Sequence, residues 1–268
     1  MKRGDELKLN KKILFLIFSL ILSSIFGVST QARSFSWYCK RVADNKQPPL
    51  PAEFTMINDC SVLWINSKKE GDSDKVAYLT FDAGYENGNV EKILDTLKDK
   101  NVPGAFFILE NLIDRNPELV LRMRDEGHFV CNHTATHKDV SVMNNEAEFS
   151  KELNGLNDKY KELTGEELKK YFRPPEGKFS KESLIFTKNL GYKTVFWSFA
   201  YADWDNTKQP SAEYAKKKIY DNIHNGCVLL LHPTSAVNAE ILGDVIDHMR
   251  SEGYTFGTLD DLSLEMGK

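Results

Sequence analysis

The chain has 268 residues, of which 41% are hydrophobic and 28% charged, so it can bury one large core or two small ones. Its formal net charge of −4, together with the lack of any long lysine or arginine block, argues against a nucleic-acid-binding protein. A neutral or modestly charged ligand suits this balance better.

Basic residues precede an apolar run at the start of the chain. Five lysines and arginines lie within residues 2–12, the apolar run covers 13–28, and small residues follow as far as Ala32. This pattern predicts a secretory signal peptide over residues 1–33, cleaved after Ala32. The alternative is an uncleaved membrane anchor, because the run is near the short limit of about 17–25 residues for a spanning helix. Both readings place the rest of the chain outside the cytoplasm.

Residues 34–75 show no strong periodicity but contain several aromatic and aliphatic side chains. We therefore expect an N-terminal extension that packs against the main domain as a strap. Cys39 and Cys60 both lie in this stretch, and either a disulfide between them or two unpaired thiols fits the sequence. Cys131 and Cys227 lie inside apolar runs and are expected to be small core residues. The chain has no CxxC pair, which argues against a four-thiolate zinc site.

Strands and helices alternate from residue 76 to the C-terminus. The predicted strands cover 76–81, 105–109, 129–132, 171–172, 194–198, 228–231 and 255–258. The predicted helices cover 90–100, 117–126, 144–163, 181–190, 211–224 and 238–252. Such alternation indicates an α/β fold with a parallel sheet and outer helices. About seven strands favour an irregular barrel as a single catalytic domain over 76–268. An open doubly wound sheet is the alternative, but no glycine-rich phosphate loop accompanies these strands.

Titratable or donor groups follow five of the predicted strands. These groups are Asp82, the pair His133 and His137, Arg173, Asp203 with Trp204, and His232. Each alone has an ordinary explanation, such as a strand cap, a surface charge or a hydrogen-bonded core histidine. The carboxyl ends of barrel strands form one rim, where barrel enzymes carry their sites. Because such groups follow five strands that share one rim, the sequence favours a catalytic cleft there.

The same residues fall into five motifs that occur in a fixed order. The motifs are Thr80-Phe81-Asp82-Ala83, His133-Thr134-Ala135-Thr136-His137, Arg173-Pro174-Pro175, Asp203-Trp204 and Leu230-Leu231-His232. Residues 76–268 thereby resemble the polysaccharide deacetylase (NodB-type) family, carbohydrate esterase family 4. The resemblance implies a distorted (β/α)7 barrel, in agreement with the strand count.

Two imidazoles four residues apart, His133 and His137, beside a carboxylate are typical ligands for Zn²⁺ or a similar divalent ion. Such an ion polarises an acetamide carbonyl and lowers the pKa of bound water from about 15.7 toward about 7. Amide hydrolysis then needs a base for the water proton and an acid for the leaving amine. The resemblance implies that Asp82 is the base and His232 the acid.

The resemblance also assigns supporting roles around this pair. Arg173 would keep Asp82 ionised, and Asp203 would raise the pKa of His232 so that it can donate a proton near neutral pH. The backbone N–H near Glu176 is the candidate donor to the oxyanion. Two further residues would form the walls of the acetyl pocket, namely Trp204 and Leu230.

The chain departs from the family pattern at Ala83, where most members have a second aspartate as metal ligand. Alanine cannot coordinate a metal, so two protein ligands remain where catalytic zinc usually has three. We expect metal affinity to be weak, with water or substrate completing the coordination shell, or the metal to be dispensable.

The phrase Thr-Phe-Asp-x-Gly-Tyr-Glu-Asn-Gly, read over residues 80–88, and the stretch 232–240 are similar to the muramic-acid deacetylase subgroup. That subgroup implies N-deacetylation of N-acetylmuramic acid in peptidoglycan, followed by closure to muramic δ-lactam in the spore cortex. The implied partner is the peptidoglycan glycan strand. We expect the protein to be a monomer that acts at the cell wall or forespore envelope. One alternative is a deacetylase of N-acetylglucosamine, or an O-acetyl esterase. The other is a non-catalytic glycan-binding relic, although the retained acid and base argue against it.

Overall fold

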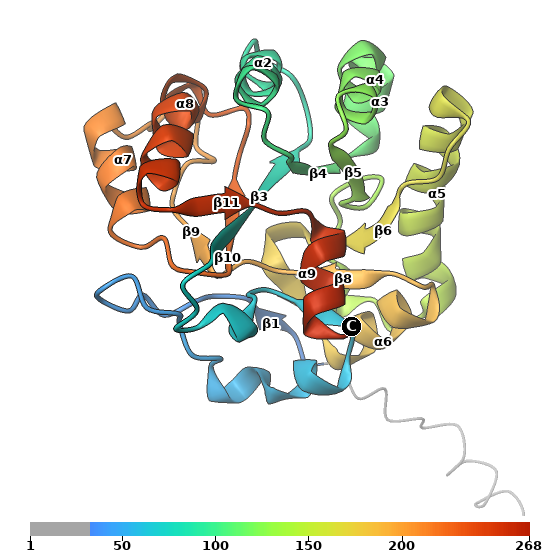
Figure 1. Ribbon diagram of the computed structural model, residues 1–268. Coiled ribbons are helices and arrows are strands. Elements are labelled where there is room, and N and C mark those ends of the chain that lie inside the picture. The colour runs from blue at the N-terminus through green and yellow to red at the C-terminus, as the bar shows by residue number, and fades with distance from the viewer. Residues whose placement is uncertain (1–32) are drawn as a thin grey trace, which may run out of the picture. The chain divides into compact units, whose positions relative to one another are not determined.

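A curled parallel sheet organises residues 33–268, the part of the chain that the computed structural model describes (Figure 1). The predicted leader over residues 1–33 lies outside this part except for its last residue. Within the described part, no helix is both long enough and apolar enough to cross a membrane.

The sheet contains every strand predicted from the sequence and two more. The strands of the sheet are β2 (Val62–Leu63), β3 (Lys75–Ala83), β4 (Ala105–Ile108), β5 (Phe129–Asn132), β6 (Lys169–Phe172), β8 (Lys193–Val195), β9 (Phe199–Ala200), β10 (Cys227–Leu231) and β11 (Tyr254–Phe256). The nine strands run in the order β2-β8-β6-β5-β4-β3-β10-β9, with β11 paired to β3, and the pairing is parallel throughout. The predicted α/β fold with a distorted barrel is confirmed.

The two additional strands are β2 and β9, which stand at the two ends of the strand order. Just after β2, Ile65 forms an isolated bridge with Cys227 at the start of β10, so the first strand of the order returns to a strand near its other end. The predicted strand 194–198 is interrupted after Val195. The Phe196 N–H still bonds the Leu63 carbonyl of the neighbouring β2 (2.8 Å), whereas the Ser198 N–H bonds the Val228 carbonyl of β10 (3.0 Å).

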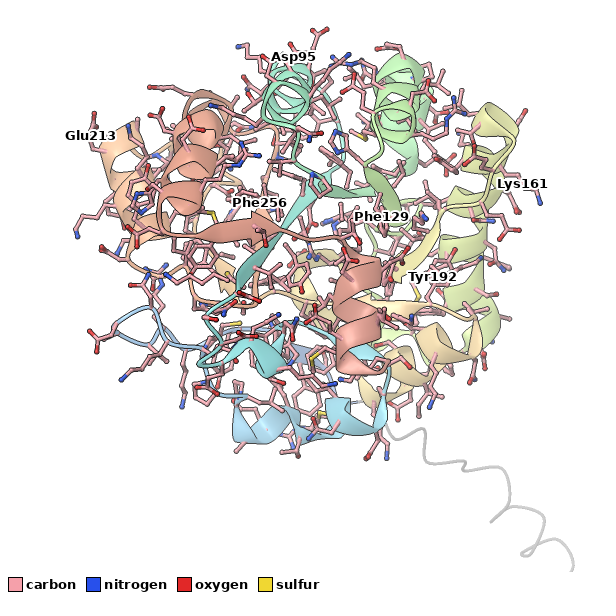
Figure 2. The ribbon with its side chains drawn as sticks, in the orientation of Figure 1. Asp95, Phe129, Lys161, Tyr192, Glu213 and Phe256 are labelled. Carbon is pink, nitrogen blue, oxygen red and sulfur yellow. The ribbon has the colours of Figure 1, made fainter. Side chains whose placement is uncertain are left out.

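Most of the helices connect the strands and cover the outer face of the sheet, whereas the last helix packs Leu259 and Leu262 among side chains of β4, β5 and β6 (Figure 1). They are α2 (Val90–Lys100), α3 (Glu110–Arg115), α4 (Pro117–Asp125), α5 (Glu146–Thr164), α6 (Lys181–Asn189), α7 (Ala212–Tyr220), α8 (Ala236–Ser251) and α9 (Leu259–Met266). The sequence interpretation lacked α3 and α9. Figure 2 shows Asp95, Lys161 and Glu213 on the outward sides of α2, α5 and α7, where they are exposed. The helices thus turn their charged sides to water and their apolar sides to the sheet.

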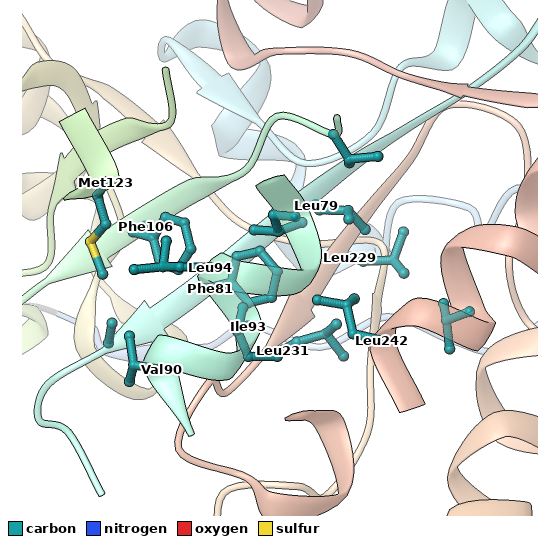
Figure 3. Packing of buried hydrophobic residues seen from close by; sticks show 14 of the residues in the cluster. Leu79, Phe81, Val90, Ile93, Leu94, Phe106, Met123, Leu229, Leu231 and Leu242 are labelled. Carbon is teal, nitrogen blue, oxygen red and sulfur yellow. The ribbon is translucent and has the colours of Figure 1, made fainter. Parts of the chain in front are cut away.

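Side chains of β3 alternate between the barrel interior and the helices. Leu79 and Phe81 belong to the large cluster that packs with α2 and α8 (Figure 3). Tyr78 belongs to the interior cluster with side chains from β4, β5, β6 and β10. Because side chains alternate along a strand, Thr80 and Asp82 share the interior face with Tyr78. This alternation aims Asp82 into the mouth of the barrel.

The strap over residues 34–75 combines packing with sheet formation. Strand β1 (Phe35–Ser36) pairs antiparallel with β7 (Lys178–Phe179), whereas β2 belongs to the main sheet itself. The Trp37 ring stacks on Phe196 with centroids 4.4 Å apart, and its Nε1–H donates to the Trp197 carbonyl at 2.9 Å. All four cysteines are free thiols, so no disulfide joins the strap.

Candidate active site

A cleft of about 820 Å³ opens at the carboxyl ends of the strands. The residues that line it are Asp82, Gly84, Tyr85, Leu109, His133, His137, Glu176, Gly177, Trp197, Ala200, Tyr201, Trp204, Leu230, His232 and Thr234. Seven of the nine residues singled out from the sequence are among them. The other two, Arg173 and Asp203, are buried next to the cleft and contact its residues.

Arg173 anchors Asp82. Its guanidinium is completely buried and donates from Nη1 to Asp82 Oδ1 at 2.7 Å and from Nη2 to Thr80 Oγ1 at 2.8 Å. The remaining donors bond the backbone carbonyls of Val195 and Phe196 at 3.1 and 3.3 Å. Burial alone would raise the pKa of Asp82, but the charge of Arg173 opposes this and holds the pKa below its ordinary value. Asp82 is therefore ionised at neutral pH.

His133 has a defined tautomer. Its Nδ1 lies 2.7 Å from the Arg173 carbonyl oxygen, which can only accept, so Nδ1 carries the proton. Nε2 then has a free lone pair and lies 3.7 Å from Asp82 Oδ2. Burial lowers the pKa of His133 to about 4, so the imidazole is neutral at physiological pH. The His137 ring is next to it, with centroids 5.1 Å apart.

A strained loop carries the two histidines. Thr134 and His137 both have positive φ angles, 73° and 60°, which are uncommon for residues with side chains. The His137 N–H donates to Thr134 Oγ1 at 2.8 Å, and the Thr136 N–H donates to the buried Glu152 carboxylate at 3.0 Å. These bonds hold a backbone conformation that brings both imidazoles to one side of the cleft.

His232 and Asp203 form a second hydrogen-bonded pair in the site. Asp203 is buried and accepts from His232 Nδ1 at 2.7 Å and from the His232 backbone N–H at 2.9 Å. This contact leaves Nε2 as the atom able to donate a proton. Burial alone would lower the pKa of His232, but the hydrogen bond and charge of Asp203 oppose this and raise it above the ordinary value.

The residues predicted to bind substrate also lie in the cleft. Trp204 is 62% exposed, and its ring centroid is 6.4 Å from that of His232, whereas Leu230 is buried in the wall. Glu176 has a φ of 55°, and its carboxylate is turned to solvent, where Lys178 Nζ contacts it at 2.8 Å. Gly177 must lack a side chain, because a Cβ there would lie 2.7 Å from the Trp197 ring.

Three positioning residues were not identified from the sequence. Thr80 bonds Arg173, Asn238 Nδ2 donates to Asp203 Oδ2 at 2.6 Å, and Glu152 braces the histidine loop. Thr80 and Asn238 both lie inside stretches that resemble the family. Their polarity at otherwise buried positions was the available signal, since buried polar groups need partners.

His133, His137 and Asp82 are of the residue types that bind divalent ions. The His133 lone pair, the nearby His137 ring and Asp82 converge, but Asp82 already binds Arg173. Among residues 33–268, no group of three or more His, Cys, Asp or Glu side chains is arranged to hold a metal. Ala83 is completely buried in the apolar cluster and supplies no ligand.

Comparison with known proteins places these features in a family. The model of the polysaccharide deacetylase family matches residues 69–195. The peptidoglycan-N-acetylmuramic acid deacetylase PdaA of Bacillus subtilis is 38% identical over 231 residues, which are 86% of each chain. The chain belongs to the polysaccharide deacetylase family. It is thus a member of a family of hydrolases, as its motifs predicted.

Solved structures of family members support this membership. The structure of Bacillus subtilis PdaA, a family 4 carbohydrate esterase, superposes with a TM-score of 0.82 at 37% identity and covers 87% of this chain and 98% of that one. A family 4 carbohydrate esterase from Bacillus anthracis gives a TM-score of 0.71 at 36% identity, with 87% and 97% covered. An uncharacterized 30.6 kDa protein of Geobacillus stearothermophilus is 38% identical over 250 residues, 92% of each chain.

Proposed function

We propose that this polysaccharide deacetylase removes the N-acetyl group from N-acetylmuramic acid in peptidoglycan. The observation that carries the proposal is the pairing of an ionised Asp82 with a His232 of raised pKa in one cleft. The similarity to PdaA supports the choice of sugar. Peptidoglycan as substrate implies work at the cell wall, in keeping with the predicted leader.

The two charged pairs divide the chemistry of amide hydrolysis. Asp82 accepts a proton from the attacking water, and Arg173 keeps it ionised for this role. His232 Nε2 donates a proton to the nitrogen as the C–N bond breaks, and Asp203 stabilises the imidazolium before that transfer. Acetate and a free amine are the products. The backbone N–H of the Glu176 turn is the proposed donor to the oxyanion, and Trp204 and Leu230 enclose the acetyl methyl group.

His133 and His137 would hold the divalent ion, with Zn²⁺ matching their imidazole donors best. When bound, such an ion supplies Lewis-acid polarisation of the carbonyl and a more acidic water. The neutral Nε2 of His133 is available for it because Nδ1 is bonded to the Arg173 carbonyl.

The free amine of muramic acid lies on the same sugar as the lactyl carboxyl group. In strands without peptide, the two groups can condense to the δ-lactam with loss of water. We propose that the product of this protein enters that ring closure in the spore cortex.

One observation favours N-acetylglucosamine as an alternative substrate. Among the described residues that line the cleft there is no lysine or arginine, while Glu176 contributes a carboxylate. A free lactyl carboxylate would meet no lysine or arginine among them, whereas N-acetylglucosamine carries no such charge.

Mass spectrometry of peptide-free peptidoglycan strands tests the proposal. We expect residues 33–268 to remove acetyl from muramic residues, followed by loss of water as the lactam closes. Acetyl loss confined to glucosamine would select the alternative. A parallel incubation with a chelator measures how far turnover depends on metal.

The variant Ala83→Asp is expected to bind Zn²⁺ at least about tenfold more tightly, because it restores a third ligand. Ala83 is completely buried, so the new carboxylate is destabilising unless a metal neutralises it. The Tm of this variant should therefore fall with chelator and recover with Zn²⁺. Ala83→Ser is the matched control without a carboxylate. Unchanged affinity by calorimetry would contradict the assignment of the metal ligands.

The variant Asp203→Asn is expected to move the alkaline limb of kcat/KM to lower pH by about one unit or more. Asp203 raises the pKa of His232, so without it burial lowers the pKa and the acid loses its proton earlier. The raised pKa of His232 also makes the stability of the folded protein depend on pH. The raised folded-state pKa stabilises the protein fully below the unfolded pKa of about 6.5, and this contribution is lost as pH rises through the folded-state value. A pH–rate profile with an unmoved alkaline limb would show that Asp203 does not control His232.

A further inference from the structure

One aromatic side chain at the mouth of the cleft has no part in the acid–base chemistry. Tyr85 is 45% exposed, yet it lines the same cleft as Asp82 and His232. Ligand pockets are lined by aromatic side chains, and an exposed ring within such a lining offers a ligand an apolar face. Tyr85 is therefore available to bind a part of the substrate away from the reacting amide.

The Tyr85 ring is fixed in orientation. Its hydroxyl accepts a hydrogen bond from Asn206 Nδ2 at 2.7 Å. The preceding carbonyl, of Gly84, accepts from Asn111 Nδ2 at 3.1 Å. The following side chain, Glu86, accepts from the backbone N–H of Gly88 at 2.7 Å and from that of Val90, the first residue of α2, at 2.9 Å. A rigid aromatic face binds with little further loss of conformational entropy.

Asn206 lies on a second ordered loop, which begins at Asp203. Gln209 Nε2 donates to the carbonyls of Asp203 and Asp205 at 3.0 Å each. Asp205 Oδ1 also accepts from the backbone N–H and the hydroxyl of Thr207 at 2.9 and 2.6 Å. The bond between Asn206 and Tyr85 thus joins this loop to the loop after β3, beside the reacting groups.

We propose that Tyr85 and Asn206 form a binding subsite for a sugar next to the one that is deacetylated. The Tyr85 face would stack on the C–H face of that pyranose, and Asn206 is the positioning residue that fixes the ring. This inference rests on the proposed glycan substrate. A polymer extends beyond the sugar whose acetamide meets Asp82 and His232, so its neighbouring sugars meet the rim of the cleft.

Kinetics on two lengths of the same glycan test the subsite. The probes are a peptide-free octasaccharide and a disaccharide of alternating N-acetylglucosamine and N-acetylmuramic acid. We expect Tyr85→Ala to lower the octasaccharide-to-disaccharide ratio of kcat/KM about tenfold, mainly through KM. Tyr85→Phe keeps the ring but loses the bond, so it and Asn206→Ala should each lower the ratio about threefold.

Three controls distinguish a sugar-binding role of Tyr85 from a purely structural role between the two loops. Asn206→Ala should have no further effect on the ratio in the Tyr85→Ala background, since it acts through that ring. Tyr214→Ala removes a tyrosine of similar exposure (54%) on α7, outside the cleft, and should leave the ratio unchanged. Equal losses on both substrates after Tyr85→Ala, with a lowered Tm, would overturn the proposal.

Binding without turnover distinguishes this inference from the proposed function. Calorimetry with the octasaccharide compares Asp82→Asn with the double variant Asp82→Asn/Tyr85→Ala. Weaker binding by the double variant supports the subsite, whatever the unaltered protein deacetylates. If the unaltered protein leaves muramic residues acetylated, that failure refutes only the proposed substrate. Equal binding by the two variants overturns the subsite and leaves the proposed function standing.

Discussion

Asp82→Asn is expected to lower kcat for deacetylation by about 10³-fold without unfolding the protein. The amide oxygen of asparagine can still accept the hydrogen bond that Arg173 Nη1 donates to Asp82 Oδ1. It cannot accept a proton from water, so the variant loses the general base and keeps the packing. Acetate release from peptide-free strands measures kcat, and circular dichroism with a thermal melt checks the fold.

A surface variant controls for the substitution itself. Asp125→Asn makes the same change on α4, where the side chain is 61% exposed and pairs with its neighbour Arg124. It should retain turnover, because exposed ion pairs contribute little to stability. His232→Ala removes the proposed acid and should lower kcat by about 10²-fold or more. Turnover close to that of the unaltered protein in either cleft variant would refute the acid–base assignment.

The sequence predicted the central strands well because each is a short, mostly apolar run. The predicted range 129–132 coincides with β5, and the predicted helix 90–100 coincides with α2. Strand β2 was missed because two apolar residues, Val62 and Leu63, carry no periodicity. They become a strand only through their long-range pairing with β8. Helix α3 was missed because it starts two residues after β4 and has only six residues.

The candidate site was predictable to the extent that its residues follow strands. Asp82, Arg173 and His232 each stand at or just beyond a strand's carboxyl end, so the parallel topology alone brings them to one rim. Their partners depend on tertiary distance. Thr80 lies 93 residues from Arg173 in the chain, and no local pattern couples such positions. The left-handed conformations in the histidine loop likewise depend on Glu152, which belongs to the next helix.

Arg173→Met is expected to lower the free energy of unfolding by about 3–5 kcal/mol and to abolish most activity. The guanidinium is completely buried and makes four hydrogen bonds, to Asp82, to Thr80 and to two backbone carbonyls. Methionine has a similar apolar length but leaves these acceptors unpaired. Arg173→Lys should recover only a part of the stability, because one ammonium group cannot reproduce the planar set of donors. Urea denaturation of each variant measures the loss.

The pH dependence of that loss shows whether the charge of Asp82 is its cause. The lowered pKa of Asp82 stabilises the folded protein above the unfolded pKa of about 3.9, and this contribution disappears as pH falls through the folded-state value. Without Arg173, the main charge that opposes burial is lost and the pKa of Asp82 rises, so the variant should be least stable relative to the unaltered protein near neutral pH. Adding Asp82→Asn removes the unpaired charge and should restore about 1–2 kcal/mol at pH 7. Strictly additive losses in the double variant would show that Arg173 stabilises the barrel through its backbone contacts alone.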